Sequence, residues 1–124
     1  MGHVNNAVYF TYFEQARIVA ADTFGLRRVL EDCGLGLIMA HGSCDYKAPV
    51  KFGDVVDVRV TIGSIGLSSF TLEYEARRLK DEAVVAFGKS VQAVFDYGVE
   101  KTTPIPDSLR TKLEALVASS TIDQ

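Results

Sequence analysis

A change in hydrophobic period near Gly36 limits the folds open to this chain more than any other feature of its sequence. Before it, apolar residues recur every three or four positions from Ala7 to about Phe24, which predicts a long helix. After it, apolar and polar residues alternate in runs separated by short turns, which predicts strands that pair antiparallel. One long helix, at least four strands and a terminal helix are typical of an α+β domain, not of alternating βαβ units.

The first predicted helix is apolar on more than one side. One face carries a regular stripe, formed by Tyr9, Phe13, Ala16, Ala20 and Phe24. The opposite side is also rather apolar, so we expect the helix to be buried against more than one surface. Glu14 and Arg17, three residues apart, are predicted to be partners on the helix surface. Gly25 is placed to end the helix, and residues 26–33 are predicted to form a second, short one.

The strands are predicted at residues 37–47, 54–62, 69–78 and 84–95, with turns at 63–66 and 80–82. The last of these segments is apolar on both faces, as expected for a strand covered on each side. Beyond Pro104 and Pro106, leucines at helical spacing predict a short amphipathic helix, followed by a loose tail at about 119–124. Because 124 residues can bury one core but not two, residues 1–124 are predicted to form a single domain.

Composition and charge exclude several classes of partner. Thirteen Lys and Arg against 16 Asp and Glu give a net charge of -3, so the broad basic field needed for nucleic acid is missing. No apolar stretch approaches the length of a membrane span, and the N-terminus lacks a signal peptide, so we expect no membrane partner and a cytoplasmic location. Cys33 and Cys44 lack metal-ligand spacing. We therefore expect two ordinary thiols, no metal and no cofactor.

The polar residues that lead into the first helix are the main candidates for chemistry. Gly2, His3, Asn5 and Asn6 stand beside the free backbone amides of a helix start, which attract negative charge. If a carbonyl carbon were attacked there, these amides could hold the oxyanion. Glu14 lies roughly 12 Å further along the helix axis, too far to act as the base. The alternative is that Asn5 and Asn6 only cap the helix and His3 is a loop residue.

A compact basic group near one strand end has two interpretations. Arg77, Arg78 and Lys80 could form a solvated edge, since charged residues protect strands from unwanted pairing. They could instead contact a phosphate-bearing part of a substrate.

The run from Gly2 to Arg17 resembles the motif G-H-V-N-N-x-x-Y-x-x-Y-x-E-x-A-R of the hotdog-fold acyl-CoA thioesterases, in the 4-hydroxybenzoyl-CoA thioesterase superfamily. Residues 46–54 also resemble the family's strand and turn Y-x-x-P-V-x-F-G-D. The resemblance implies an antiparallel sheet wrapped around a long central helix, and hydrolysis of acyl-CoA to a free acid and coenzyme A. It also implies homodimers joined edge to edge, often pairing into homotetramers, with active sites between subunits.

The same resemblance assigns roles to residues. It implies that the backbone amide of Asn6 faces the thioester carbonyl and that His3 matches a catalytic histidine. The substrate-binding positions that it suggests are Gly2, Asn5, Tyr9, Phe13 and Phe52. Of these, Tyr9, Phe13 and Phe52 would border the acyl or pantetheine channel, although core packing explains them equally well. The arginine pair that some relatives use for the nucleotide phosphates would fall near Gly66 and Leu67, so Arg77, Arg78 and Lys89 are taken as substitutes for it.

The chain departs from the family pattern at its start. Relatives of this type carry a catalytic aspartate three residues before the glycine that matches Gly2, a position that here precedes Met1. The first strand of the family's fold is missing as well, so we expect the sequence to begin at an internal methionine of a longer functional protein. A chain starting at Met1 should then hydrolyse substrate at least about 100-fold more slowly than an extended one. The alternatives are an inactive truncated form, a form that works through His3, or a non-catalytic hotdog module that binds acyl-CoA or an acyl carrier protein.

Overall fold

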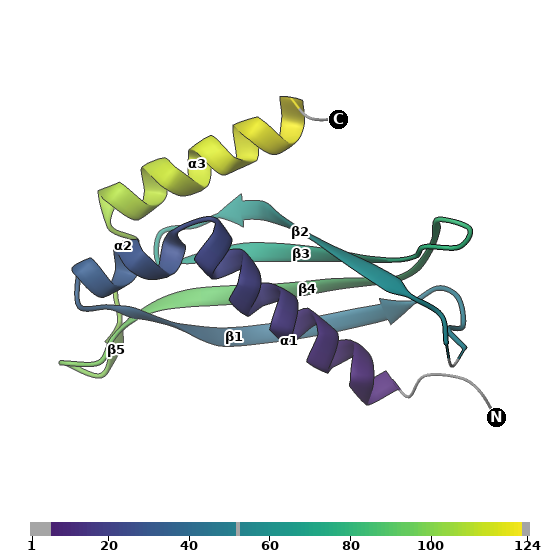
Figure 1. Cartoon of the computed structure of the whole chain (residues 1–124). Coiled ribbons are helices and arrows are strands. Elements are labelled where there is room, and N and C mark those ends of the chain that lie inside the picture. The colour runs from purple at the N-terminus through teal and green to yellow at the C-terminus, as the bar shows by residue number, and fades with distance from the viewer. Residues whose placement is uncertain (1–5, 52, 123–124) are drawn as a thin grey trace.

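The computed structural model of the chain describes residues 6–51 and 53–122, and the side chains of residues 15–51 and 53–117 (Figure 1). Its elements in chain order are α1 (Asn6–Thr23), α2 (Leu26–Asp32), β1 (Gly36–Tyr46), β2 (Val56–Ile65), β3 (Ser69–Arg78), β4 (Ala83–Asp96), β5 (Lys101–Thr102) and α3 (Asp107–Ile122). The predicted α+β class and antiparallel sheet are confirmed. The strand expected before Gly2 concerns sequence upstream of Met1 and stays a prediction.

The strands form one antiparallel sheet in the order β1-β4-β3-β2, with the short β5 paired to β4. The first strand of the chain therefore pairs with the last long one, Gly36 opposite Phe95 and Tyr46 opposite Ala86. The strand β3 pairs with its sequence neighbours β2 and β4 through short connections. This order leaves β1 and β2 at the two edges of the sheet.

The helices pack on one face of the sheet and enclose the core (Figure 1). Alternate residues of β3 point into this core, because successive side chains of a strand face opposite sides. The fully buried leucines of α3 and α2 meet them there, so α3 belongs to the core and is not a peripheral addition. The largest buried side chains are Phe70, Leu26, Leu109, Leu113, Gln92, Val85 and Val94.

Two boundary predictions are wrong. The turn predicted at 63–66 begins only at Gly66, because Gly63 and Ser64 continue β2 through a register shift between Ile62 and Ile65. The hydroxyl groups of Ser64 and Thr71 form a 3.2 Å hydrogen bond across this irregularity. The tail predicted at 119–124 is also wrong as far as Ile122, since α3 continues to that residue. The sequence contains no Gly or Pro there to stop a helix.

The helix α1 uses one face for packing within the chain. Ala20 is buried and Ala16 packs against the core, whereas Ile18 and Val19 are 50% and 63% exposed. Ile18 and Val19 therefore face outward. Among the residues that the structure describes, none forms the second surface against which this helix is predicted to be buried. Arg17 is predicted to lie on the surface beside Glu14, but the structure places it half-buried against the sheet.

Candidate active site

The start of α1 lies at one end of the sheet, near the end of β1 and the start of β2 (Figure 1). Asn6 is the first residue of the helix, so its amide belongs to the first turn, whose N–H groups have no partner within a helix. The predicted site residues Gly2, His3 and Asn5 lie outside the described residues. The predicted geometry of the oxyanion site therefore stays a prediction, with its position set by the helix start.

The aromatic positions predicted to border the channel have side chains that lie outside the described part of the chain. Tyr9 and Phe13 lie in the first half of α1, where only the backbone is described, and Phe52 is outside the described residues. Lys51 and Asp54 are joined by two hydrogen bonds: the Lys51 amide donates to the Asp54 carboxylate over 2.9 Å, and the Asp54 amide donates back to the Lys51 carbonyl over 3.0 Å. Gly53 takes a positive φ of 95° there, a conformation that favours glycine.

Arg78 fastens this segment to the turn between β3 and β4. Its guanidinium donates to both carboxylate oxygens of Asp81, over 3.0 and 2.8 Å, and to the Pro49 carbonyl over 2.6 Å. This bidentate pair holds the pKa of Asp81 down to about 2, with smaller contributions from the Ala83 amide and from Lys80. The contacts described for Arg78 are thus with Asp81 and Pro49 of the protein itself. That Arg78 also holds substrate stays a prediction.

The structure does not bring Arg77, Arg78 and Lys89 together. Arg77 pairs with Glu75 on the sheet face opposite the helices, whereas Arg78 is on the next position along β3. Lys89 stands opposite Glu73 on that outer face, four residues from Arg77 along β3, or roughly 13 Å. It borders a shallow hollow of about 380 Å³ lined by Ser43, Asp45, Glu73, Tyr74, Phe87, Gly88 and Lys89. The three side chains therefore lie in separate environments of one subunit, and the predicted role of each in holding substrate stays a prediction.

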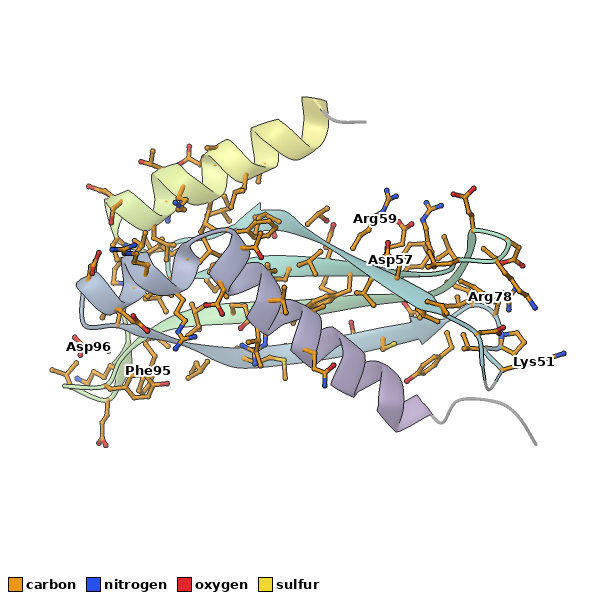
Figure 2. The ribbon with its side chains drawn as sticks, viewed as in Figure 1. Lys51, Asp57, Arg59, Arg78, Phe95 and Asp96 are labelled. Atoms are coloured by element: carbon orange, nitrogen blue, oxygen red, sulfur yellow. The ribbon has the colours of Figure 1, made fainter. Side chains whose placement is uncertain are left out.

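Lys51 is not among the predicted site residues, yet it is better placed than these three. It is exposed in the segment that also holds Phe52, and Figure 2 shows its side chain extending away from the end of the sheet where α1 begins. Lys80 is exposed in the neighbouring turn, with its ammonium nitrogen 3.8 Å from an Asp54 oxygen. The sequence could have pointed to Lys51 as a site residue, because it lies inside the run that resembles the family's Y-x-x-P-V-x-F-G-D motif.

A groove of about 520 Å³ runs between α1 and β2, and we call it the α1–β2 groove. Its lining is mostly aliphatic and consists of Gln15, Ala16, Val19, Val50, Asp54, Val55, Val56 and Val58. Its α1 residues lie roughly 13 Å or more along the helix axis from Asn6, and it extends from there to the segment that precedes β2. Such a surface suits an acyl or pantetheine chain better than a charged group.

A chain of three buried polar side chains crosses the sheet on the helix side, and we call it the polar chain. The hydroxyl groups of Tyr74 and Ser90 form a 2.7 Å hydrogen bond, and the Gln92 amide nitrogen donates to the Ser90 hydroxyl over 2.9 Å. Burial raises the pKa of Tyr74, and the hydrogen bond with Ser90 and the charge of Arg17 offset only part of that increase. Sequence reasoning missed this cluster, whose members meet only once β3 and β4 pair.

The comparisons with known proteins identify the family. Residues 1–113 match the model of the Thioesterase-like superfamily, and the chain belongs to that family. A thioesterase from Thermus thermophilus, solved with coenzyme A and zinc, has 32% identity and a TM-score of 0.76, with 94% of this chain and 83% of that one covered. The BH1999 gentisyl-coenzyme A thioesterase has 25% identity and a TM-score of 0.75, covering 91% and 88%. These neighbours confirm the predicted hotdog fold.

Two curated relatives agree over a shorter stretch. A protein from Aquifex aeolicus (strain VF5) is 31% identical over 75 residues, which is 59% of this chain. A protein from Bacillus subtilis (strain 168) is 32% identical over 81 residues, which is 65% of this chain. The chain thus spans only 58% and 54% of the length of these relatives.

Two further observations concern the expected absences. Within residues 6–51 and 53–122, no helix is both long and apolar enough to cross a membrane. The same described residues hold no group of three or more His, Cys, Asp or Glu side chains arranged to bind a metal ion.

Proposed function

We propose that this protein is an acyl-CoA thioesterase that hydrolyses the thioester to a free acid and coenzyme A. The observation that carries the proposal is the match of residues 1–113 to the Thioesterase-like superfamily, together with the start of α1 at Asn6, inside the run that resembles the family motif. The solved neighbours support the substrate class, since one holds coenzyme A and another is a gentisyl-coenzyme A thioesterase.

In the proposed reaction, water attacks the thioester carbonyl carbon and the carbonyl oxygen becomes an oxyanion. The Asn6 amide stabilises that oxyanion, because an N–H in the first turn of a helix is unpaired and the helix dipole is positive there. The tetrahedral intermediate then collapses and releases the coenzyme A thiolate and the acid. His3 and Asn5 shape the loop around the carbonyl, and the resemblance places the general base upstream of Gly2.

The free edge of β1 supports a homodimer. Its sequence from Gly36 to Tyr46 holds one Asp and no Lys, Arg, Glu or Pro, although natural sheets protect long edges with such residues. Met39 on this strand and Ile18 on α1 are both at least half exposed beside it. A second copy pairing through β1 would cover these side chains and continue the sheet, as the resemblance implies.

The coenzyme A phosphates are proposed to lie at the end of the sheet where Lys51 and Lys80 are exposed. A Lys51→Ala substitution should raise KM for acyl-CoA while leaving KM for the matching acyl-pantetheine, which lacks the nucleotide, within about twofold. The same change at Lys101, exposed on β5 at the opposite end, is the matched control and should affect neither value.

Thiol release from a panel of acyl-CoA esters tests the proposal, using the 124-residue chain and a version extended at its N-terminus by a strand and an aspartate of the family pattern. Turnover by either supports it. Absence of turnover by both overturns it, and tight acyl-CoA binding without turnover would establish the binding module instead. An Asn6→Pro variant removes the amide N–H at the first helical position, where proline is tolerated, and should lower kcat by ~10² to 10³. Asn6→Ala keeps the N–H and should lose much less.

A further inference from the structure

The connection between β1 and β2, which we call the β1–β2 segment, comprises residues 47–55. Among its described residues it contains no helix or strand, yet it is held to the sheet at both ends. At its start, two backbone amides donate to the Val85 carbonyl over 2.9 and 3.3 Å. At its end, the Leu79 amide donates to the Val55 carbonyl over 2.9 Å. The position of Lys51 therefore depends on what holds the middle of the segment.

Arg78 holds that middle part. Its Nη1 donates to the Pro49 carbonyl over 2.6 Å, two residues before Lys51. Its Nε and Nη2 donate to the two carboxylate oxygens of Asp81 over 3.0 and 2.8 Å. Each nitrogen of the guanidinium thus has an acceptor within the protein, and the side chain is only 16% exposed. A bidentate pair of this kind fixes geometry as well as charge, so we call these contacts the Arg78 clamp.

The Arg78 clamp is anchored on the sheet itself. Arg78 is the last residue of β3, and Asp81 lies in the turn to β4, where it also accepts from the Ala83 amide over 3.3 Å. Lys80 stands on the same turn, with a side chain that is 65% exposed. Figure 2 shows Arg78 at the same end of the sheet as Lys51. The clamp therefore ties together two elements that each carry an exposed lysine.

Asp54 lies between these two lysines. One of its carboxylate oxygens accepts from the Lys51 amide over 2.9 Å, and the other is 3.8 Å from the Lys80 ammonium nitrogen. The Asp54 side chain is only 11% exposed. An ammonium group has three N–H donors, so Lys80 keeps donors for a ligand while it faces Asp54. Because Asp81 neutralises Arg78, the positive charge offered to a ligand here comes from the two lysines.

We propose that Arg78 is a positioning residue that sets the spacing of Lys51 and Lys80, so that both ammonium groups reach the phosphates of one coenzyme A. The inference rests on the proposed thioesterase function and on the phosphate position proposed with it. Coenzyme A carries a diphosphate and a separate 3′-phosphate, and two cations held at a fixed spacing lose less entropy on binding it than two that move independently. Arg78 acts through the lysines and touches no phosphate itself.

A charge-neutral variant tests the clamp. Arg78→Gln/Asp81→Asn removes one positive and one negative charge, so it breaks the clamp and keeps the net charge of the 124-residue chain. Calorimetry measures the dissociation constants of S-octyl-coenzyme A, a non-hydrolysable thioether, and of S-octylpantetheine, which lacks the nucleotide. The first should rise by ~5-fold or more, and the second should stay within about twofold. In a chain that turns over, KM for acyl-CoA should rise likewise with kcat within about twofold.

Arg110→Gln is the matched control. Arg110 also donates to the carbonyl of a turn, that of Gly66 over 2.6 Å, but this turn joins β2 to β3 at the opposite end of the sheet. Its loss should change neither dissociation constant by more than about twofold.

A second background separates positioning from direct contact. In a Lys51→Ala/Lys80→Ala chain, breaking the Arg78 clamp should weaken S-octyl-coenzyme A by no more than about twofold, because the groups that it positions are gone. An equal effect in both backgrounds overturns the inference, since Arg78 would then touch a phosphate itself. Equal weakening of both ligands overturns it too, because the clamp would then only stabilise the fold, and so does an unchanged affinity for S-octyl-coenzyme A.

The outcomes distinguish this inference from the proposed function. If the expected binding pattern is found and no ester is hydrolysed, the thioesterase function fails while the role of Arg78 stands. If esters are hydrolysed without that pattern, or the wild type does not bind S-octyl-coenzyme A, the role of Arg78 is refuted. Should Arg78→Gln/Asp81→Asn not fold, Arg78→Lys decides by the same measurements, because lysine keeps the charge and lacks the planar fork that spans Asp81 and Pro49.

Discussion

Replacing Ser90 by alanine should weaken the fold more than its small change in volume suggests. Ser90 is 3% exposed and stands at the centre of the polar chain, where it bonds both Tyr74 and Gln92. The substitution takes one hydrogen bond from each of two buried side chains and leaves the Gln92 amide nitrogen without its acceptor. It creates almost no cavity, so the effect measured is that of the hydrogen bonds.

The magnitude follows from the number of bonds lost. A typical buried hydrogen bond contributes about 1 kcal/mol, and an amide stranded in the interior costs about 1 to 3 kcal/mol. We therefore expect Ser90→Ala to lower the free energy of unfolding by about 2 to 4 kcal/mol. Tyr74→Phe removes the bond to Ser90 and leaves the Gln92 bond in place, so it should cost about 1 kcal/mol. Gln92→Met removes an unpaired oxygen together with one bond, so the free energy of unfolding should change by less than about 1 kcal/mol.

Urea unfolding followed by circular dichroism measures these differences, with the slope of the transition compared between variants to confirm that the unfolded states are alike. Ser64→Ala is the matched control, since Ser64 is exposed on the same sheet and its bond to Thr71 faces the other side. It should cost less than about 0.5 kcal/mol. Equal effects of Ser90→Ala and Ser64→Ala would refute the reasoning, because the polar chain would then contribute nothing.

Three further predictions concern other parts of the chain. Gly25→Ala should lower the free energy of unfolding by about 1 kcal/mol in the same assay, because Gly25 has a positive φ of 75°. Cys44 should react with a thiol reagent more slowly than the exposed Cys33, as followed by mass spectrometry, because burial raises the pKa of the Cys44 thiol. Asp81→Asn should be less stable than the wild type at neutral pH. Because Arg78 lowers the pKa of Asp81 from 3.8 to about 2, that stability difference should be complete above pH 4 and fade as the pH falls toward 2.

Most of the fold could be predicted from local patterns, since hydrophobic period depends on neighbouring residues. The alternation from Ser69 to Arg78 predicts the bounds of β3, and Gly25 correctly predicts the break between the first two helices. The irregularity at Gly63 could not be told from a turn, because a glycine and a serine signal a turn and a bulge alike. The continuation of α3 to Ile122 has no apolar periodicity beyond Val117 to predict it.

The candidate site was less accessible to sequence reasoning. Arg17 fits a surface pair with Glu14 on a helical projection, and only the packing of α1 on the sheet shows that it is turned inward. The polar chain depends on cross-strand register, which brings Leu72 opposite Ser90 and Phe70 opposite Gln92. No local pattern encodes such a register, so Gln92 is unremarkable in a strand whose sequence is mainly apolar.

The pairing of β1 with β4 also bears on how the chain folds as it is synthesised. A ribosome delivers β1 well before β4, but the partner of Gly36 is Phe95, so β1 must wait for about 60 further residues before it can pair with β4. Contacts between residues so distant in sequence form late, because the entropy of closing the intervening loop must be overcome first. During that interval a strand with a single carboxylate is exposed, and the nascent chain is then most dependent on chaperones.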